Sequence, residues 1–138
     1  MKPSIVIVHC ADTPDYEKGD PKFDHFGASD IDEWHKQAGW NCIGYHWVIR
    51  RTGMIEQGRL ENVVGANCKG QNDHSLGICY IGREHMTDEQ VASLNILYRE
   101  IKKRHGIEID SWYTHNHFNP HKLCPGFFME ELKTLITA

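Results

Sequence analysis

The chain has 138 residues, with 15 Lys and Arg against 19 Asp and Glu and a formal net charge of −4. A chain of this length buries roughly 68% of its unfolded surface, which supports one compact core and leaves no room for a second domain. Hydrophobic residues make up 40% of the sequence and charged residues 25%, which is typical of a folded globular protein. The acidic balance argues against nucleic-acid binding.

The longest aliphatic run, Ile5–Val8, is too short to span a membrane or to form the core of a secretory signal. We therefore expect a protein that is made in the cytoplasm without a signal peptide and without membrane insertion. We also expect it to be a monomer. The five cysteines are an odd number and contain no C-x-x-C pair, so we expect free thiols rather than a disulfide framework.

Hydrophobic spacing and turn residues predict the elements in chain order. They are a strand over 4–10, a loop over 11–28, a helix from Ser29 to Gly39, hairpin strands over 44–51 and 54–57, a loop over 58–74, a strand over 75–81, a helix from Thr87 to Gly106, a strand over 107–114, an irregular segment over 115–126 and a helix over 127–136. This order predicts one α/β domain over residues 1–138, with a central mixed sheet flanked by helices.

Local patterns support two of the helices. Ser29 and Thr87 each have the spacing of an N-cap, and Gln90 completes a capping box with Thr87. In the first helix, Ile31, Trp34 and Ala38 fall on one face.

Metal-binding residue types lie at the ends of predicted strands. His9 ends the first strand, His115 follows the last, and Cys124 comes nine residues later. Sites in open α/β sheets gather at the carboxyl ends of strands, and two imidazoles with a thiolate suit a zinc ion whose fourth position is open. In extended chain, Lys122 would face the same side as Cys124.

Spacing alone leaves other interpretations open. A histidine at a strand end is often a core or surface residue, a cysteine before Pro-Gly often serves packing, and His117 and His121 compete with His115 as ligands. The zincin and zinc-deaminase signatures are absent, as are a glycine-rich phosphate loop and a G-x-S-x-G elbow. The residues by themselves therefore leave a zinc hydrolase as one of several interpretations.

Five motifs carry a family resemblance. They are IVHC at Ile7–Cys10, WHKQAGW at Trp34–Trp40, GYHW at Gly44–Trp47, SLGIC at Ser75–Cys79 and KLCPGF at Lys122–Phe127. In this order they resemble the zinc-dependent N-acetylmuramoyl-L-alanine amidases, in particular the small phage endolysins, whose fold is shared with peptidoglycan recognition proteins. The resemblance covers nearly the whole chain.

The resemblance implies a role for particular residues. It implies a Zn²⁺ ion bound by His9, His115 and Cys124, with Tyr45 and Lys122 as catalytic residues. The implied reaction is hydrolysis of the amide bond between N-acetylmuramic acid and L-alanine in bacterial peptidoglycan, by an endolysin that acts on the cell wall after release. Two alternatives remain: a non-catalytic peptidoglycan-binding module, which would tend to lack the ligand cysteine, and a cytosolic amidase that recycles muropeptides.

Three positions depart from the family pattern. Asn67 stands where many members have a histidine, which predicts an altered substrate contact. Cys79 stands where cytosolic recycling members tend to have a glutamate, which favours the endolysin branch. His121 is an extra residue between His115 and Cys124, so His117 stays an alternative to His115 as the metal ligand.

Overall fold

The computed structural model describes residues 1–136 of the chain. Its elements are β1 (Ile5–Cys10), α1 (Ala28–Gln37), β2 (Trp47–Ile49), β3 (Ile55–Gln57), β4 (Ser75–Tyr80), α2 (Asp88–His105), β5 (Trp112–Thr114), α3 (His115–Phe118) and α4 (Met129–Leu135). Among these residues, none of the helices combines the length and the apolar character needed to cross a membrane.

The five strands form one sheet in the order β3-β2-β4-β1-β5. Neighbouring strands run parallel except for β3, which is antiparallel to β2 at one edge. The interior strand β1, between β4 and β5, is a β-branched run in which Val6, Ile7 and Val8 have no solvent-exposed surface, as a parallel strand covered on both faces requires. The structure confirms the predicted mixed sheet.

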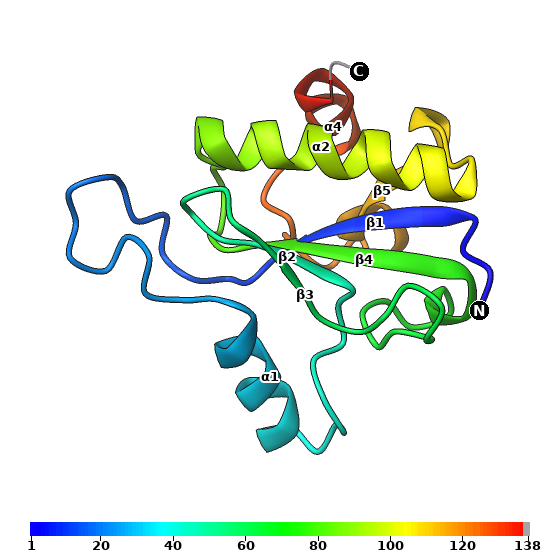
Figure 1. Cartoon of the computed structure of the whole chain (residues 1–138), viewed down its shortest axis with the longest axis horizontal. Helices are drawn as coiled ribbons and strands as arrows, with labels where there is room; N and C mark the ends of the chain where they lie inside the picture. The colour runs from blue at the N-terminus through cyan, green and yellow to red at the C-terminus, as the bar shows by residue number, and fades with distance from the viewer. Residues whose placement is uncertain (137–138) are drawn as a thin grey trace.

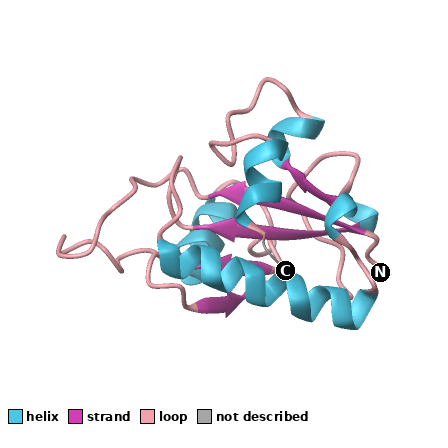
Figure 2. Ribbon diagram, turned by 90° about the horizontal axis from the view of Figure 1, so that it is seen from above, coloured by secondary structure: helices cyan, strands magenta, loops and turns pink. Residues whose placement is uncertain are grey.

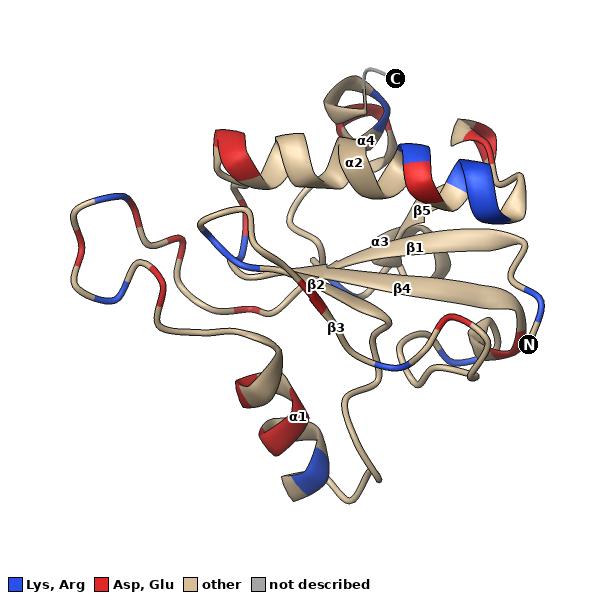
Figure 3. Cartoon of the chain, in the orientation of Figure 1, with Lys and Arg blue, Asp and Glu red and all other residues tan. Residues whose placement is uncertain are grey.

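Helices cover both faces of this sheet. In Figure 1, α2 and α4 lie above the strands and α1 lies below them, while the loop between β1 and α1 extends to the left of the sheet. Figure 2, seen from above, shows the long helix α2 running roughly along the direction of the strands. The larger apolar cluster joins the sheet to α2 and α4, and a smaller one around Ile31 and Val48 lies on the α1 side. Figure 3 shows charged residues concentrated on helices and loops. Strand β3 contains the charged residue Glu56.

The two predicted helix starts have different outcomes. At α2 the prediction is confirmed: the Thr87 hydroxyl accepts a hydrogen bond from the Gln90 backbone at 3.0 Å, and Gly106 ends the helix with φ of 70°. At α1 the predicted N-cap Ser29 is wrong, because the cap is Gly27, whose N–H donates to the Asp30 carboxylate at 2.8 Å.

The face predicted for α1 is only partly buried. Ile31 is buried, whereas Trp34 is 37% exposed and Ala38 is also exposed. The helix lies below the sheet in Figure 1, and Ile31 is its residue that joins the buried part of the smaller apolar cluster.

Two predicted strands are shorter than expected. In the hairpin, β2 spans Trp47–Ile49 rather than 44–51, and before it the Gly44 carbonyl accepts a hydrogen bond from the Ala66 N–H of the following loop at 3.0 Å. Before β5, the Ser111 N–H donates to the Glu108 carbonyl at 2.9 Å and forms a turn, so the strand begins at Trp112 rather than at residue 107.

Candidate metal centre and active site

The two candidate histidines lie on neighbouring parallel strands. His9 is the penultimate residue of β1, and His115 directly follows β5. Because β1 and β5 run parallel, with Val8 opposite Thr114, their carboxyl ends meet at one edge of the sheet. The centroids of the two imidazole rings are 4.5 Å apart. The sheet thus brings together two residues that are 106 positions apart in the sequence (115 − 9 = 106).

Cys124 reaches this edge from the segment that follows α3. Its carbonyl accepts a hydrogen bond from the Asn116 N–H at 3.0 Å, and its Sγ accepts one from the Cys10 N–H at 3.1 Å. The carbonyl of Pro125, the next residue, accepts a hydrogen bond from the buried Tyr80 hydroxyl at 2.7 Å. These bonds fix the thiol next to His9, with 3.8 Å between Sγ and Nδ1.

One potential ligand atom from each of His9, His115 and Cys124 lies within 4.8 Å of the other two. Ligands at about 2.0 Å (N) and 2.3 Å (S) from a tetrahedral zinc ion lie about 3.6 Å apart, close to the separation of His9 Nδ1 and Cys124 Sγ. Two imidazoles and one thiolate leave one of four positions open, as catalytic zinc sites do. The donor set and its spacing therefore fit a zinc ion.

The competing histidines lie outside this group. Among residues 1–136, His9, His115 and Cys124 are the residues that form a potential metal-binding group. His117 instead stacks on Tyr113, with ring centroids 5.0 Å apart, and His121 lines the cavity described below.

Burial controls the protonation of these side chains. His9 is 1% exposed, and burial, with a further effect from His115, lowers its pKa from 6.5 to about 3. Burial and the nearby Lys122 also lower the pKa of His115. Both imidazoles are therefore neutral at neutral pH, the form that binds metal. Hydrogen bonding with the Cys10 thiol and burial raise the pKa of Cys124, and a divalent cation would oppose this effect.

Tyr45 belongs to a row of rings beside the histidines. Its ring centroid is 4.9 Å from that of His9 and 5.4 Å from that of His35, which in turn lies 4.4 Å from Trp40. The Gly44 N–H donates to His35 Nδ1 at 2.9 Å, which ties α1 to the segment that carries Tyr45. Burial, followed by the nearby Cys79, raises the pKa of Tyr45, so its hydroxyl stays protonated at neutral pH.

A cavity of about 600 Å³ opens over this edge of the sheet. Tyr45, His115, Lys122 and Cys124 all line it, so both predicted catalytic residues face the same cavity as two of the three predicted ligands. Its rim carries the exposed Leu123. The remaining lining residues are Cys10, Ala11, Asp12, Arg83, Glu84, His121, Gly126 and Phe128.

Sequence analysis missed one contact of this site. His9 Nε2 lies 3.1 Å from the side-chain oxygen of Asn67, in the loop between β3 and β4. Asn67 was expected to alter a substrate contact, whereas in the structure it contacts a predicted ligand. No local pattern signals this contact, because the two residues are 58 positions apart.

Comparisons with known proteins show which family this chain is similar to. The family model "N-acetylmuramoyl-L-alanine amidase" matches residues 1–127. The endolysin of Escherichia phage T7 is 32% identical over 145 residues, which cover 96% of this chain and 89% of that protein. Among solved structures, the N-acetylmuramoyl-L-alanine amidase LysC from Clostridium intestinale URNW has a TM-score of 0.80 and 32% identity, covering 97% of this chain and 85% of that chain.

A second structural relative extends the likeness to animal proteins. Wild-type Drosophila PGRP-LB has a TM-score of 0.78 and 26% identity, covering 97% of this chain and 82% of that chain. The family match spans most of the chain, and the relatives are covered over most of their length. The chain therefore belongs to the N-acetylmuramoyl-L-alanine amidase family.

Proposed function

We infer that this protein is a peptidoglycan amidase of the endolysin type, which hydrolyses the amide bond between N-acetylmuramic acid and the L-alanine of the stem peptide. The observation that carries this inference is the convergence of His9, His115 and Cys124 beside a cavity that Tyr45 and Lys122 also line. The family match and the similarity to phage endolysins support it.

We propose that His9, His115 and Cys124 hold a zinc ion. When bound in such a site, zinc supplies Lewis acidity that polarises a carbonyl oxygen and makes a water molecule more acidic. The three side chains would hold the ion beside the cavity, where an amide substrate has room to enter. His9 is buried and His115 and Cys124 are half-buried, so solvent has limited access to this side of the cavity.

Lys122 is proposed as an electrostatic catalyst. Lys122 lines the cavity, and its charge is near enough to His115 to lower the pKa of that residue. As the amide carbon becomes tetrahedral, negative charge develops on the former carbonyl oxygen. A preorganised cation stabilises that charge, and loss of one such donor typically costs about 10²–10³ in rate.

Tyr45 is proposed as the hydrogen-bond donor of the site. Because its pKa is raised, the hydroxyl keeps its proton at neutral pH. A protonated phenol can orient the attacking water or supply a proton toward the nitrogen of the leaving amine. Both roles require the hydroxyl, which separates Tyr45 from rings that serve packing alone.

The retained thiol favours an enzyme over a non-catalytic binding module. A binding module needs no open-coordinated metal site, yet here Cys124 lies 3.8 Å from His9 Nδ1. We further propose that residues 1–138 act as one domain and as a monomer, on the cell wall after release from the cytoplasm. The similarity to endolysins of several phages supports this role over cytosolic recycling of muropeptides.

Mass spectrometry of digested bacterial sacculi tests the proposed reaction. The wild-type protein should release stem peptides with new L-alanine amino termini and leave the glycan strands intact. Cys124→Ser should lose both zinc retention and cleavage, because a hydroxyl is a poor substitute for a thiolate ligand.

Two results would contradict the proposal. Cleavage within the glycan strands or between amino acids of the stem peptide would exclude the amidase reaction. Near-wild-type lysis by Cys124→Ser would remove this cysteine from the active site. Comparing turnover on intact sacculi with turnover on soluble muropeptides separates a wall-degrading enzyme from a recycling one.

A further inference from the structure

The buried imidazole of His9 has different partners at its two ring nitrogens. Nδ1 lies 3.8 Å from Cys124 Sγ, and Nε2 lies 3.1 Å from Asn67 Oδ1. An amide oxygen accepts hydrogen bonds but cannot donate them, so the ring proton belongs on Nε2. The lone pair is then on Nδ1, on the side of the ring that faces the thiol.

The amide of Asn67 is held in place by its surroundings. The Asn72 side-chain oxygen accepts hydrogen bonds from the backbone N–H groups of Asn67 and Cys68, at 2.9 and 3.0 Å. A Cβ atom at Gly77 of β4 would lie 2.7 Å from Asn67 Cγ, and one at Gly65 would lie 2.7 Å from Asn67 Nδ2. Real Cβ atoms do not approach so closely, so both glycines are needed to make room for this amide.

The amide nitrogen of Asn67, unlike its oxygen, contributes no hydrogen bond within the described residues. Among residues 1–136, Asn67 Nδ2 is buried and has no hydrogen-bond partner. Leaving a buried donor unsatisfied typically costs about 1–3 kcal/mol. An apolar side chain of similar size would avoid that cost. The feature that an apolar side chain would lack is the oxygen that faces His9.

We propose that Asn67 is a positioning residue for the metal centre: its amide oxygen holds the His9 ring in the orientation and tautomer that present Nδ1 to the metal. This rests on the proposed function, in which His9 is a ligand. With the proton on Nδ1 instead, that nitrogen would point a hydrogen at the thiol and could not bind a cation. Hydrogen bonds to the distal nitrogen of ligand histidines typically affect metal affinity by about 10- to 100-fold.

Zinc affinity, measured by competition with a chromophoric chelator, tests this proposal. Asn67→Leu removes the acceptor and the unsatisfied donor at similar volume, and should weaken zinc binding by about 10- to 100-fold. Asn67→Asp keeps an acceptor at the same place and should bind zinc at least as tightly as the wild type. Asn62→Leu, an exposed position on the same loop, is the matched control and should leave the affinity unchanged.

A second measurement uses the metal-free wild-type protein. Nitrogen-15 NMR of the imidazole should show His9 with its proton on Nε2, and this preference should weaken in Asn67→Leu. A purely structural role for Asn67 would not change the tautomer. Thermal unfolding of each variant shows that it is folded before its affinity is compared.

The outcomes separate the two proposals. If the wild type binds no zinc, the proposed metal centre fails. If the wild type binds zinc and Asn67→Leu binds it equally well, the role of Asn67 is wrong. Equal losses in Asn67→Leu and Asn67→Asp would indicate packing rather than hydrogen bonding, and a proton on His9 Nδ1 in the wild type would overturn the proposal without any variant.

Discussion

His9 shows how burial keeps an imidazole in the neutral form that can bind a metal ion. In water an imidazole is partly protonated near neutral pH, and a protonated ring offers no lone pair. Burial lowers the pKa of His9 to about 3, so the ring is neutral across the physiological range. One nitrogen then donates to Asn67 and the other faces Cys124. A single substitution at this position would remove both contacts.

Tyr45 and Lys122 should be separable from the ligands by mutation. We expect Tyr45→Phe and Lys122→Ala to retain zinc, because neither side chain belongs to the His–His–Cys group, but to lose about 10²–10³ in turnover. Metal analysis and cleavage rates on purified sacculi provide the measurement.

Matched controls make this prediction specific. Tyr113→Phe removes a hydroxyl from a ring that stacks on His117, and Lys69→Ala removes an exposed cation on a different loop. Both should cleave sacculi at near-wild-type rates. A metal-free Tyr45→Phe or Lys122→Ala variant would show that the assigned division between ligands and catalytic groups is wrong.

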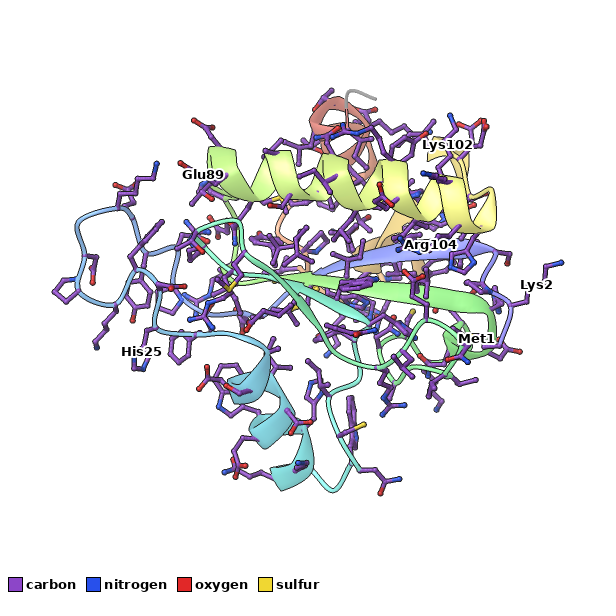
Figure 4. The ribbon with its side chains drawn as sticks, viewed as in Figure 1. Met1, Lys2, His25, Glu89, Lys102 and Arg104 are labelled. Atoms are coloured by element: carbon purple, nitrogen blue, oxygen red, sulfur yellow. The ribbon has the colours of Figure 1, made fainter. Side chains whose placement is uncertain are left out.

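At the scale of elements, Glu61 joins the loop after β3 to the C-terminal end of α2. Its carboxylate accepts hydrogen bonds from Trp47 Nε1 at 2.8 Å, from Arg104 at 2.8 and 2.9 Å and from His105 Nε2 at 2.9 Å. Figure 4 shows Arg104 below that end of the helix. Burial alone would raise the pKa of Glu61, but the hydrogen bonds outweigh burial and lower it from 4.5 to about 2.

This cluster predicts a pH-dependent contribution to stability. Because the pKa of Glu61 is lower in the folded state, its stabilisation is present above about pH 4.5 and is lost as the pH falls toward about 2. Glu61→Gln should lower the free energy of unfolding by about 2 kcal/mol at neutral pH and by less at about pH 3. Urea unfolding at both pH values measures the difference.

Glu100→Gln is the control for the Glu61 prediction. Glu100 is exposed and forms a single pair with Arg104, at 3.6 Å, and such surface pairs contribute about 0–1 kcal/mol. A loss in Glu61→Gln no larger than in Glu100→Gln would contradict the role assigned to the cluster.

Elements differ in how well local sequence determines them. The capping box of α2 is made of neighbouring residues, Thr87 and Gln90, and was predictable. The start of α1 was not: Ala28 N–H donates to Glu56 of β3 at 2.9 Å, a contact across the fold that favours a cap at Gly27 rather than at Ser29. Before the hairpin, Gly44 likewise bonds to Ala66, in a loop that lies 22 positions later (66 − 44 = 22). Contacts with distant segments decided these boundaries.

At the scale of the whole molecule, the sheet order assembles the candidate metal centre. Since β1 lies between β4 and β5 and runs parallel to both, His9 and His115 emerge at the same edge. The segment 119–127 then returns over that edge and delivers Cys124. The three predicted ligands thus come from separate parts of the chain, and none of their distances follows from sequence spacing.

Zinc should therefore stabilise the folded chain, because the unfolded chain does not hold these ligands together. A ligand present at about 1,000 times its Kd adds about 4 kcal/mol of stability. For a protein of this size that corresponds to a rise in Tm on the order of 10 °C. A chelator should lower the Tm by this amount, and added zinc should restore it.

Cys124→Ser gives the reference for the chelation experiment. Its Tm should respond to neither chelator nor zinc, since one of three proposed ligands is lost. A wild-type Tm that is insensitive to both would argue against a metal bound by the folded state.

Local sequence was enough to predict the α/β class, the buried character of β1, the cap of α2 and a set of residues whose chemistry suits a zinc hydrolase. Those features depend on side-chain type, on hydrophobic periodicity or on motifs within a few residues. The folded structure was needed to show that His115 joins His9 and Cys124, whereas His117 packs on Tyr113. It was also needed to show that Asn67 bonds to His9. The physical reason is that these contacts join segments brought together by strand pairing, and local sequence carries no record of such distances.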